Sequence, residues 1–469
     1  MYSMQMHGCG TSILKRTAMG HHLIHSVPAV MSRQRNLLLT VCLISLVTLW
    51  GCRLPRLCIF DQCNADITAG PLAHRKVDLS SIEAPYIGWP LERVCKETQF
   101  TPGLVFICDN NSGGIGNIRN YILTCVRYAI EAGATGLVMP QIRTRSDKNL
   151  ADLMLDYRDF DYFFDKEHFR GAMNRHCPSI RLFDNTWDIP NTKEPFQAER
   201  ITPRDFGLRG GCDSRDLNRH TDLFRPRFDA WLNETALKFD RLIQSWKDPR
   251  VIRLNWGVQW DWPVHRDGPE FAATYGGLLR FRGDIVDLGK RTAKAMRDLT
   301  LMRKGAGQYA GFHLRTESDA LSQWPDFERQ ATEYLAEAST RKFQAAYLAT
   351  GNETEATKFK DRALSQHRML VVTKHDILQD RTEELKALQS LTWDQQALID
   401  YIVLLESDFF LGVSPSSFSM NVALKRHLQM DGLFTRTWKV GGDDGRSRIV
   451  GNFSRYWDDW LFMYDSLWP

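Results

Sequence analysis

One short segment of this chain carries side chains suited to holding a phosphate group. Residues 308–319 read Gln-Tyr-Ala-Gly-Phe-His-Leu-Arg-Thr-Glu-Ser-Asp. Tyr309–Leu314 alternates small or apolar with larger residues, which predicts a strand that ends just before Arg315. In an open α/β sheet, ligands bind outside the carboxyl ends of the strands, and the planar guanidinium of arginine suits phosphate. Arg315 is therefore either an anion ligand or one half of a surface ion pair.

A second candidate for phosphate binding lies about a hundred residues further on. Residues 409–412 predict a buried strand, and a helix running to about Arg426 follows it. Between them stand Ser416, Ser417 and Phe418. Hydroxyl and N–H groups at a helix start can hold a phosphate without a metal ion. The alternative is an ordinary serine cap of the helix.

A glycine-rich loop forms the third candidate. Gly103–Cys108 predicts a buried parallel strand, a helix is expected from Asn117, and Gly136–Met139 predicts the next strand. The loop between the first strand and the helix contains Gly113-Gly114-Ile115-Gly116-Asn117, without the third glycine of the dinucleotide fingerprint. Such a loop lets a ligand approach the backbone, although a plain tight turn would also need glycine.

The elements that must position these residues alternate along the chain. After the glycine loop unit, the second half predicts a helix from Asp284 to Met302 and another over residues 395–405, with a strand over 369–373 between them. We therefore expect an α/β protein in which two doubly wound, Rossmann-like domains face each other across a cleft.

The amino-terminal region predicts a membrane anchor. Residues 1–60 contain no Asp or Glu, and residues 37–60 are largely apolar, so we expect a cytosolic tail (1–36), a single transmembrane helix (37–60) and a stem (61–100). A cleaved signal peptide is the alternative. The chain would then be a single-pass type II protein of the Golgi or endoplasmic reticulum membrane, with its folded part in the lumen. A net charge of +4 over 469 residues argues against nucleic acid as a partner.

Lumenal placement gives two further expectations. Glycosylation sequons occur at Asn110, Asn233, Asn352 and Asn452. The last cysteine is Cys212, so disulfides are expected only in the stem and first half. No cysteine or histidine pair has the spacing of a metal site, and we expect neither a metal nor a cofactor.

Three separated motifs, taken together, resemble the GDP-fucose protein O-fucosyltransferase superfamily. They are Gly113–Arg119, His313-Leu314-Arg315 with Asp319, and the segment from Asp400 through Ser419. The resemblance implies a GT-B glycosyltransferase fold with an amino-terminal Rossmann-like domain (101–275) and a carboxyl-terminal domain (276–469) that binds the GDP-sugar. It also implies an inverting, metal-independent transfer of fucose to a hydroxyl of a protein or glycan acceptor.

The resemblance also implies a role for each motif residue. Arg315 would bind the pyrophosphate and stabilise the leaving GDP, so it is expected to be catalytic, as is Asn117. Donor-binding residues would be Gly114, Ile115, Gly116, Asn117, His313, Arg315, Asp400, Ser416, Ser417 and Phe418. Some relatives carry a glutamate base in the glycine loop, but here Ser112, Gly113 and Gly114 stand at those positions. The sequence therefore assigns no general base.

Two alternatives remain open. The missing acid suits a non-catalytic protein that binds a GDP-sugar or a glycan on the same fold, and the motifs also allow a transferase for another GDP-sugar. The acceptor is expected to bind through the unmatched region 141–270, where Trp256, Trp260 and Trp262 could form a stacking platform or pack in a core.

Overall fold

The part of the chain that can be described begins after the expected anchor. The computed structural model describes residues 77–469 except 148, 151, 154, 193–197, 207–219, 239–244, 256–259, 304–305, 321–323, 431–434 and 457. Only the backbone is described at 204, 220–223 and 237–238. The expected tail and anchor, and most of the expected stem, lie outside these residues. Within the described ranges, no helix combines the length and the apolar character needed to cross a bilayer.

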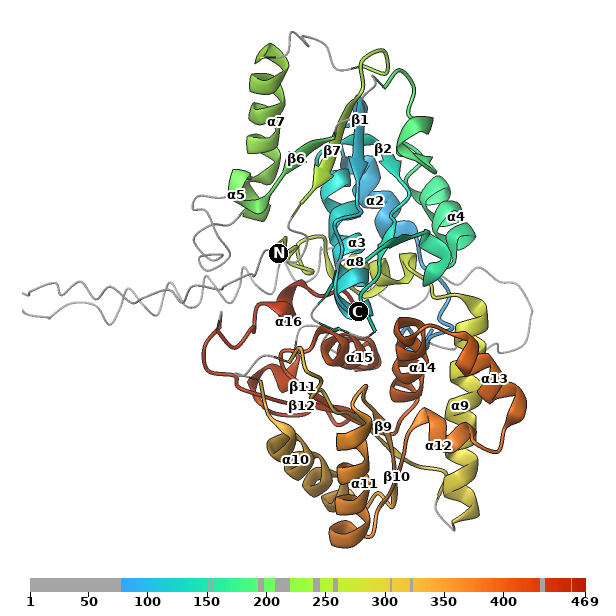
Figure 1. Cartoon of the computed structure of the whole chain (residues 1–469). Coiled ribbons are helices and arrows are strands. Elements are labelled where there is room, and N and C mark those ends of the chain that lie inside the picture. The colour runs from blue at the N-terminus through green and yellow to red at the C-terminus, as the bar shows by residue number, and fades with distance from the viewer. Residues whose placement is uncertain are drawn as a thin grey trace, which may run out of the picture. The chain divides into compact units, whose positions relative to one another are not determined.

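The first half of the described chain is built on a parallel sheet of five strands in the order β5-β2-β1-β7-β6 (Figure 1). Its elements in chain order are α2 (Trp89–Glu97), β1 (Thr101–Ile107), α3 (Ile115–Glu131), β2 (Ala134–Val138), β3 (Ile142–Arg143), β4 (Tyr157–Arg158), η1 (Phe160–Tyr162), α4 (Lys166–His176), β5 (Arg181–Phe183), η2 (Thr186–Asp188), β6 (Glu199–Ile201), α5 (Pro203–Phe206), α7 (His220–Lys238), β7 (Arg250–Leu254), α8 (Pro269–Thr274) and η4 (Tyr275–Leu278).

The second half repeats this plan with a parallel sheet in the order β10-β9-β8-β11-β12. Its elements in chain order are α9 (Gly283–Met302), β8 (Ala310–His313), α10 (Phe327–Thr340), β9 (Ala345–Ala349), α11 (Glu353–His367), β10 (Leu370–Val372), α12 (Lys374–Leu378), α13 (Thr382–Ser390), α14 (Trp393–Leu405), β11 (Phe409–Val413), α15 (Ser417–His427), η5 (Thr437–Val440), β12 (Ser447–Val450) and α16 (Met463–Ser466). The expected α/β class with parallel sheets is therefore confirmed.

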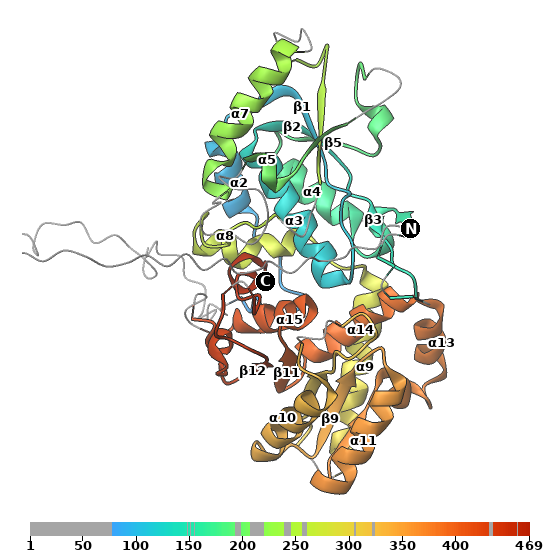
Figure 2. The ribbon, with the colours of Figure 1, turned by 60° about the vertical axis from the view of Figure 1, so that its left-hand side comes forward.

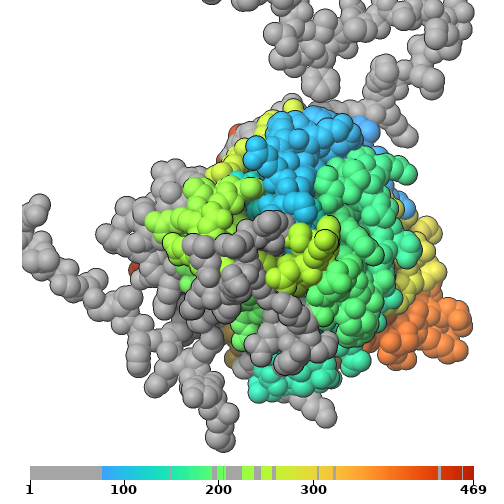
Figure 3. All heavy atoms as spheres, turned by 90° about the horizontal axis from the view of Figure 1, so that it is seen from above, coloured from blue at the N-terminus to red at the C-terminus, as the bar shows by residue number. Residues whose placement is uncertain are grey.

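The apolar residues that marked these elements form the core. On α3 the predicted inward face of Ile118, Ile122, Cys125 and Ala129 is buried. The five residues of β11 are all buried, as expected for a strand of a parallel sheet covered on both faces. In the view from above, blue, green and yellow-green segments of the first half face the viewer (Figure 3).

Two disulfides join described residues of the first half. Cys108, just after β1, is bonded to Cys125 on α3, and Cys95 on α2 is bonded to Cys177 at the end of α4. Helix α2 lies within the segment that the sequence suggested as a stem, and this bond ties it to the first half. All four cysteines lie in the region where disulfides were expected.

The two halves meet where helices α3 and α15 start. Both views place α3 and α15 side by side, with α14 next to them (Figures 1 and 2). The approach is close because a Cβ atom built on Gly116 would lie 2.8 Å from the backbone nitrogen of Phe418 and 2.8 Å from Ser417 Oγ. Real Cβ atoms do not come so near, so glycine is needed here to let the two helix starts touch.

Candidate donor-binding site

The strand order of the second sheet identifies where a ligand would bind. From β8 the chain proceeds to β9 and β10 on one side, whereas β11 and β12 lie on the other side of β8. Ligands of open α/β sheets bind at the carboxyl ends of the strands beside such a reversal of order. Here the strands concerned are β8, which ends at His313, and β11, which leads to Ser414–Ser416.

His313 and the start of α15 are in direct contact at this point. The Nδ1 atom of His313 lies 2.7 Å from Ser419 Oγ, and its ring centroid lies 4.6 Å from that of Phe418. Burial lowers the pKa of His313 to about 4. The ring is therefore neutral at physiological pH and helps to shape the site without adding positive charge.

The first turn of α15 presents the expected anion-binding groups. Ser416 is the N-cap residue, and its hydroxyl accepts a hydrogen bond from the N–H of Ser419 at 3.4 Å. Ser417 and Phe418 follow as the first helical residues, and both are half-buried. The serine cap is therefore present. It uses the N–H of Ser419 and not the N–H groups of Ser417 and Phe418, so it is compatible with the predicted phosphate site, which stays a prediction.

Arg315 lies just beyond β8, but its charge already has partners. Its guanidinium contacts Glu317 Oε2 at 2.6 Å and Asp319 Oδ1 at 2.7 Å, and the Arg315 side chain is only 16% exposed. Burial alone would lower the pKa of Arg315, but Glu317 and Asp319 outweigh it and raise that pKa. The ion pair that the sequence allowed as an alternative is present, and it is largely buried rather than at the surface.

The backbone of Arg315 is held as firmly as its side chain. Its N–H donates to Gln330 Oε1 at 2.9 Å, and its carbonyl accepts from Gln330 Nε2 at 3.0 Å. Gln330 is fully buried on α10. The loop after β8 is therefore fixed in place by the next helix.

Asp400 is also engaged with neighbouring side chains. One carboxylate oxygen accepts from Tyr347 Oη at 2.6 Å, and the other lies 2.7 Å from Lys374 Nζ. The residue is 6% exposed, on α14. Among the described residues, no contact joins Asp400 to His313 or Arg315. Asp400 lies beside β9 and the start of α12 instead.

The glycine loop brings the first half to the same place. Gly114 is the N-cap of α3, and a Cβ atom built there would have no neighbour within 4 Å. Ile115 is buried, Gly116 touches Ser417 and Phe418, and the amide of Asn117 lies over Gly113. The two helix starts that were expected to hold the donor are therefore adjacent.

Arg119, which the sequence marked only as the end of a motif, joins the halves. Its guanidinium donates to Asn421 Oδ1 at 3.1 Å on α15 and to the backbone oxygens of Gly276 at 2.9 Å, Trp468 at 2.8 Å and Pro469 at 2.7 Å. It is 5% exposed. No local pattern could reveal this role, because the partners lie more than a hundred residues away.

The candidate acceptor platform proves to be structural where it is described. Trp260 and Trp262 are buried against Tyr128, so they pack in the core rather than form an acceptor platform, while Trp256 lies outside the described residues.

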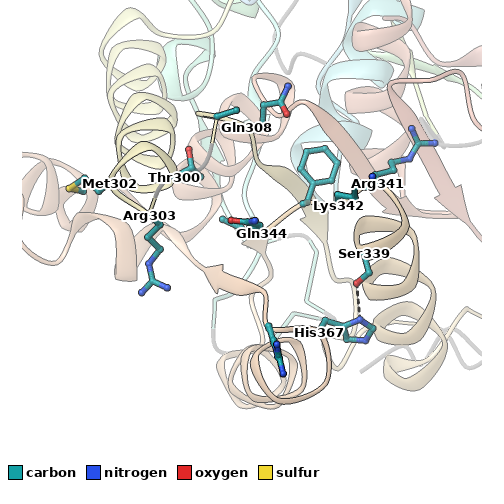
Figure 4. A pocket seen from close by; sticks show the side chains of 13 residues that line it. Thr300, Met302, Arg303, Gln308, Ser339, Arg341, Lys342, Gln344 and His367 are labelled. Carbon is teal, nitrogen blue, oxygen red and sulfur yellow. Dashed lines mark hydrogen bonds between the residues drawn. The ribbon is translucent and has the colours of Figure 1, made fainter.

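A pocket of about 890 Å³ opens near the amino ends of β8 and β9, with Arg303, Arg341 and Arg368 on its wall (Figure 4). These arginines are the C-cap residues of α9, α10 and α11, where cations offset the helix dipoles.

The chain also resembles known proteins. Solved structures similar to it include POFUT1 in complex with GDP (12% identity, 76% of this chain and 100% of that chain, TM-score 0.44). Others are an Arabidopsis thaliana FUT1 variant in complex with GDP (12%, 72% and 72%, 0.35) and the fucosyltransferase NodZ from Bradyrhizobium (15%, 69% and 93%, 0.36). Among curated proteins, none matches by sequence. The family model "GDP-fucose protein O-fucosyltransferase" matches residues 104–429, well over half of the chain, and the chain therefore belongs to that family.

Proposed function

We propose that this protein is an inverting, metal-independent glycosyltransferase of GT-B type that transfers fucose from GDP-fucose to a hydroxyl of a protein or glycan. Family membership supports glycosyl transfer. The observation that carries the proposal is the meeting of three motifs: His313 contacts Phe418, and Gly116 contacts Ser417 and Phe418. His313 and Gly116, which precede Phe418 by about 100 and about 300 positions, thus meet it at the carboxyl ends of the two sheets.

In this proposal the donor lies between the two helix starts. The N–H groups of Ser417 and Phe418, with the Ser416 and Ser417 hydroxyls, hold the diphosphate, and His313 lies beside the nucleotide. Arg315 stabilises the charge on the departing GDP with guanidinium N–H groups that Glu317 and Asp319 do not use. Gly114, Ile115, Gly116 and Asn117 form the junction with the acceptor.

In this proposal the carboxylate of Asp400 binds the guanine or its ribose. Its carboxylate accepts from Tyr347 and lies against Lys374, so a base N–H would have to share these oxygens or displace Lys374. A carboxylate oxygen has more than one acceptor position, so sharing needs no loss of the Tyr347 bond.

The proposed location is the lumen of the Golgi or endoplasmic reticulum, with residues 37–60 as a type II anchor. The two disulfides of the first half support an oxidising compartment, because such bonds are rare in cytosolic proteins. Protease treatment of sealed microsomes tests this orientation. The folded region should be protected, whereas a tag placed before residue 36 should be digested.

A binding experiment tests the donor site. We expect the full chain to bind GDP more tightly than ADP in calorimetry, and Ser417→Ala with Arg315→Ala to weaken GDP binding at least tenfold. Arg362→Ala, which removes an arginine of α11 that is paired with Glu328 of α10, is the control and should bind normally. GDP and ADP bound equally well, or full affinity in the double variant, would contradict the proposed site.

A non-catalytic GDP-sugar-binding protein is the second candidate. The internal pairing of Arg315 with Glu317 and Asp319 favours it, since a neutralised guanidinium stabilises a leaving group less well. Release of GDP from GDP-fucose separates the two: a transferase releases it, with water or an added acceptor, whereas a binding protein holds the donor intact.

A further inference from the structure

The first sheet has a reversal of strand order of its own, between β1 and β7. From β1 the chain continues to β2 and β5 on one side, whereas β7 and β6 lie on the other. Asp109 stands two residues after β1, and Arg253 on β7 is the register partner of Ile107, the last residue of β1. A carboxylate and a guanidinium therefore lie together at the carboxyl ends of β1 and β7, where an open α/β sheet binds a ligand.

The carboxylate of Asp109 is only half satisfied. Its Oδ2 lies 3.0 Å from the Arg253 guanidinium, and its side chain is 8% exposed. Its Oδ1 is buried and has no hydrogen-bond partner among the described residues. A buried acceptor that has no donor destabilises the folded state. A hydroxyl group of a bound molecule would supply the missing donor.

The loop that carries Asp109 is connected to the candidate donor site. The loop from Asp109 to Gly114 leads straight into α3, whose start touches α15. Asn111, buried in this loop, accepts from the N–H of Arg143 at 2.8 Å, and two residues later Arg145 contacts Asp319, the partner of Arg315. The loop that carries Asp109 is thus linked to Arg315 through the segment from Arg143, the last residue of β3, to Arg145.

We propose that Asp109 is the general base for the acceptor hydroxyl, which replaces the glutamate missing from the glycine loop. This inference rests on the proposed transfer from GDP-fucose. The acceptor oxygen forms a bond to the anomeric carbon of fucose while the bond from that carbon to the phosphate oxygen breaks. GDP leaves with the electron pair, and the hydroxyl proton moves to Asp109 Oδ1.

The charges around Asp109 suit this role. Burial raises the pKa of Asp109, while Arg253 and Arg143 oppose that rise. The hydroxyl of Tyr121, on α3, also lies near and donates to the Leu254 carbonyl at 2.8 Å. A carboxylate that holds a proton more readily than a free aspartate is a better acceptor for a hydroxyl proton.

Asp394 offers a matched comparison. It is also buried, and burial raises its pKa to about 6. However, it stands in the first turn of α14, where a carboxylate offsets the helix dipole, so its position has a structural explanation. Asp394→Asn therefore controls for the loss of a buried acid.

The test measures GDP release from GDP-fucose by the full chain, with water as the acceptor. The kcat of the wild type should fall at low pH, where Asp109 takes up a proton and can no longer act as a base. We expect Asp109→Asn to lower kcat about a hundredfold or more, to leave KM for GDP-fucose and GDP affinity unchanged, and to abolish that fall. In Asp109→Gly, added formate should restore part of the activity by accepting the proton. Asp394→Asn should stay within about threefold of the wild type.

The outcomes separate the two proposals. If both Asp109 variants release GDP at the wild-type rate and with an unchanged pH profile, the proposed role of Asp109 is wrong, but the proposed transferase activity is not affected. A wild-type protein that binds GDP and never releases it from GDP-fucose overturns the transferase, and the role of Asp109 with it. If Asp394→Asn, and not Asp109→Asn, abolishes the fall in kcat at low pH, then Asp394 is the general base and the proposal for Asp109 is wrong.

Discussion

The guanidinium of Arg145 lies 2.7 Å from Asp319 Oδ2, while Asp319 Oδ1 accepts from Arg315. One carboxylate of the second half therefore binds an arginine from each half. Arg145 and Asp319 side chains are 6% and 14% exposed, so water screens this contact little. The position of Arg315 at the candidate donor site thus depends on a residue of the first half.

Removing Arg145 should destabilise the protein. Breaking a buried ion pair by deleting one partner costs about 3–5 kcal/mol, because the remaining charge stays buried. We expect Arg145→Ala to lower the free energy of unfolding by about 3 kcal/mol in urea titrations. Arg158→Ala, at an exposed position of β4, is the control and should change it little. Equal stability of the two variants would show that the Arg145 contact is unimportant.

Two glycines of the loop should differ in their tolerance of an added methyl group. Gly116→Ala places a Cβ atom 2.8 Å from Ser417 and Phe418, so it should separate the helix starts at a cost of about 1–3 kcal/mol and weaken GDP binding. Gly114→Ala meets open space and should be tolerated. Thermal unfolding and calorimetry with GDP measure both effects. Similar behaviour of the two variants would refute the close approach of α3 and α15.

His313 should make stability depend on pH. The unfolded chain binds a proton at a pKa near 6.5, whereas burial lowers the pKa of the folded residue to about 4. The unfolded state therefore gains protons first as the pH falls, and stability present above pH 6.5 is lost between about 6.5 and 4. His313→Gln should reduce the slope of unfolding free energy against pH in this window. An unchanged slope would mean that His313 is not buried as described.

The disulfides should stabilise the first half to different degrees. Cys108 and Cys125 are separated by 17 residues, and Cys95 and Cys177 by 82. On the chain-entropy account, the bonds contribute about 3 and about 4.5 kcal/mol respectively. Double Cys→Ser variants of each pair, compared by urea unfolding, test this order. A larger loss from the shorter loop would point to the packing of Cys108 and Cys125 against the β1–α3 turn instead.

The sequence alone determined most of the local structure and the family. Apolar runs placed β1, β2, β10 and β11, helical periodicity placed α3, α9 and α14, and the serine turn placed the start of α15. Asp284, a possible cap of α9, lies instead in the first turn of that helix. These signals are local, since strand and helix patterns depend on neighbours a few residues apart. Less distinct strands were missed: β9, read Ala-Ala-Tyr-Leu-Ala, is rich in a residue that favours helices, and β7 carries arginines at both ends of its apolar centre.

Only the tertiary structure decided how the motif residues relate to one another. The sequence could suggest Arg315 and Asp400 as ligands, but it could not show that Glu317, Asp319, Tyr347 and Lys374 already pair with them. It gave no reason to select Asp109, which lies beside Arg253 because β1 and β7 are neighbours and whose other carboxylate oxygen is buried without a partner among the described residues. Charge pairing and burial depend on which distant segments meet, and that is settled when the two sheets fold and their helices pack.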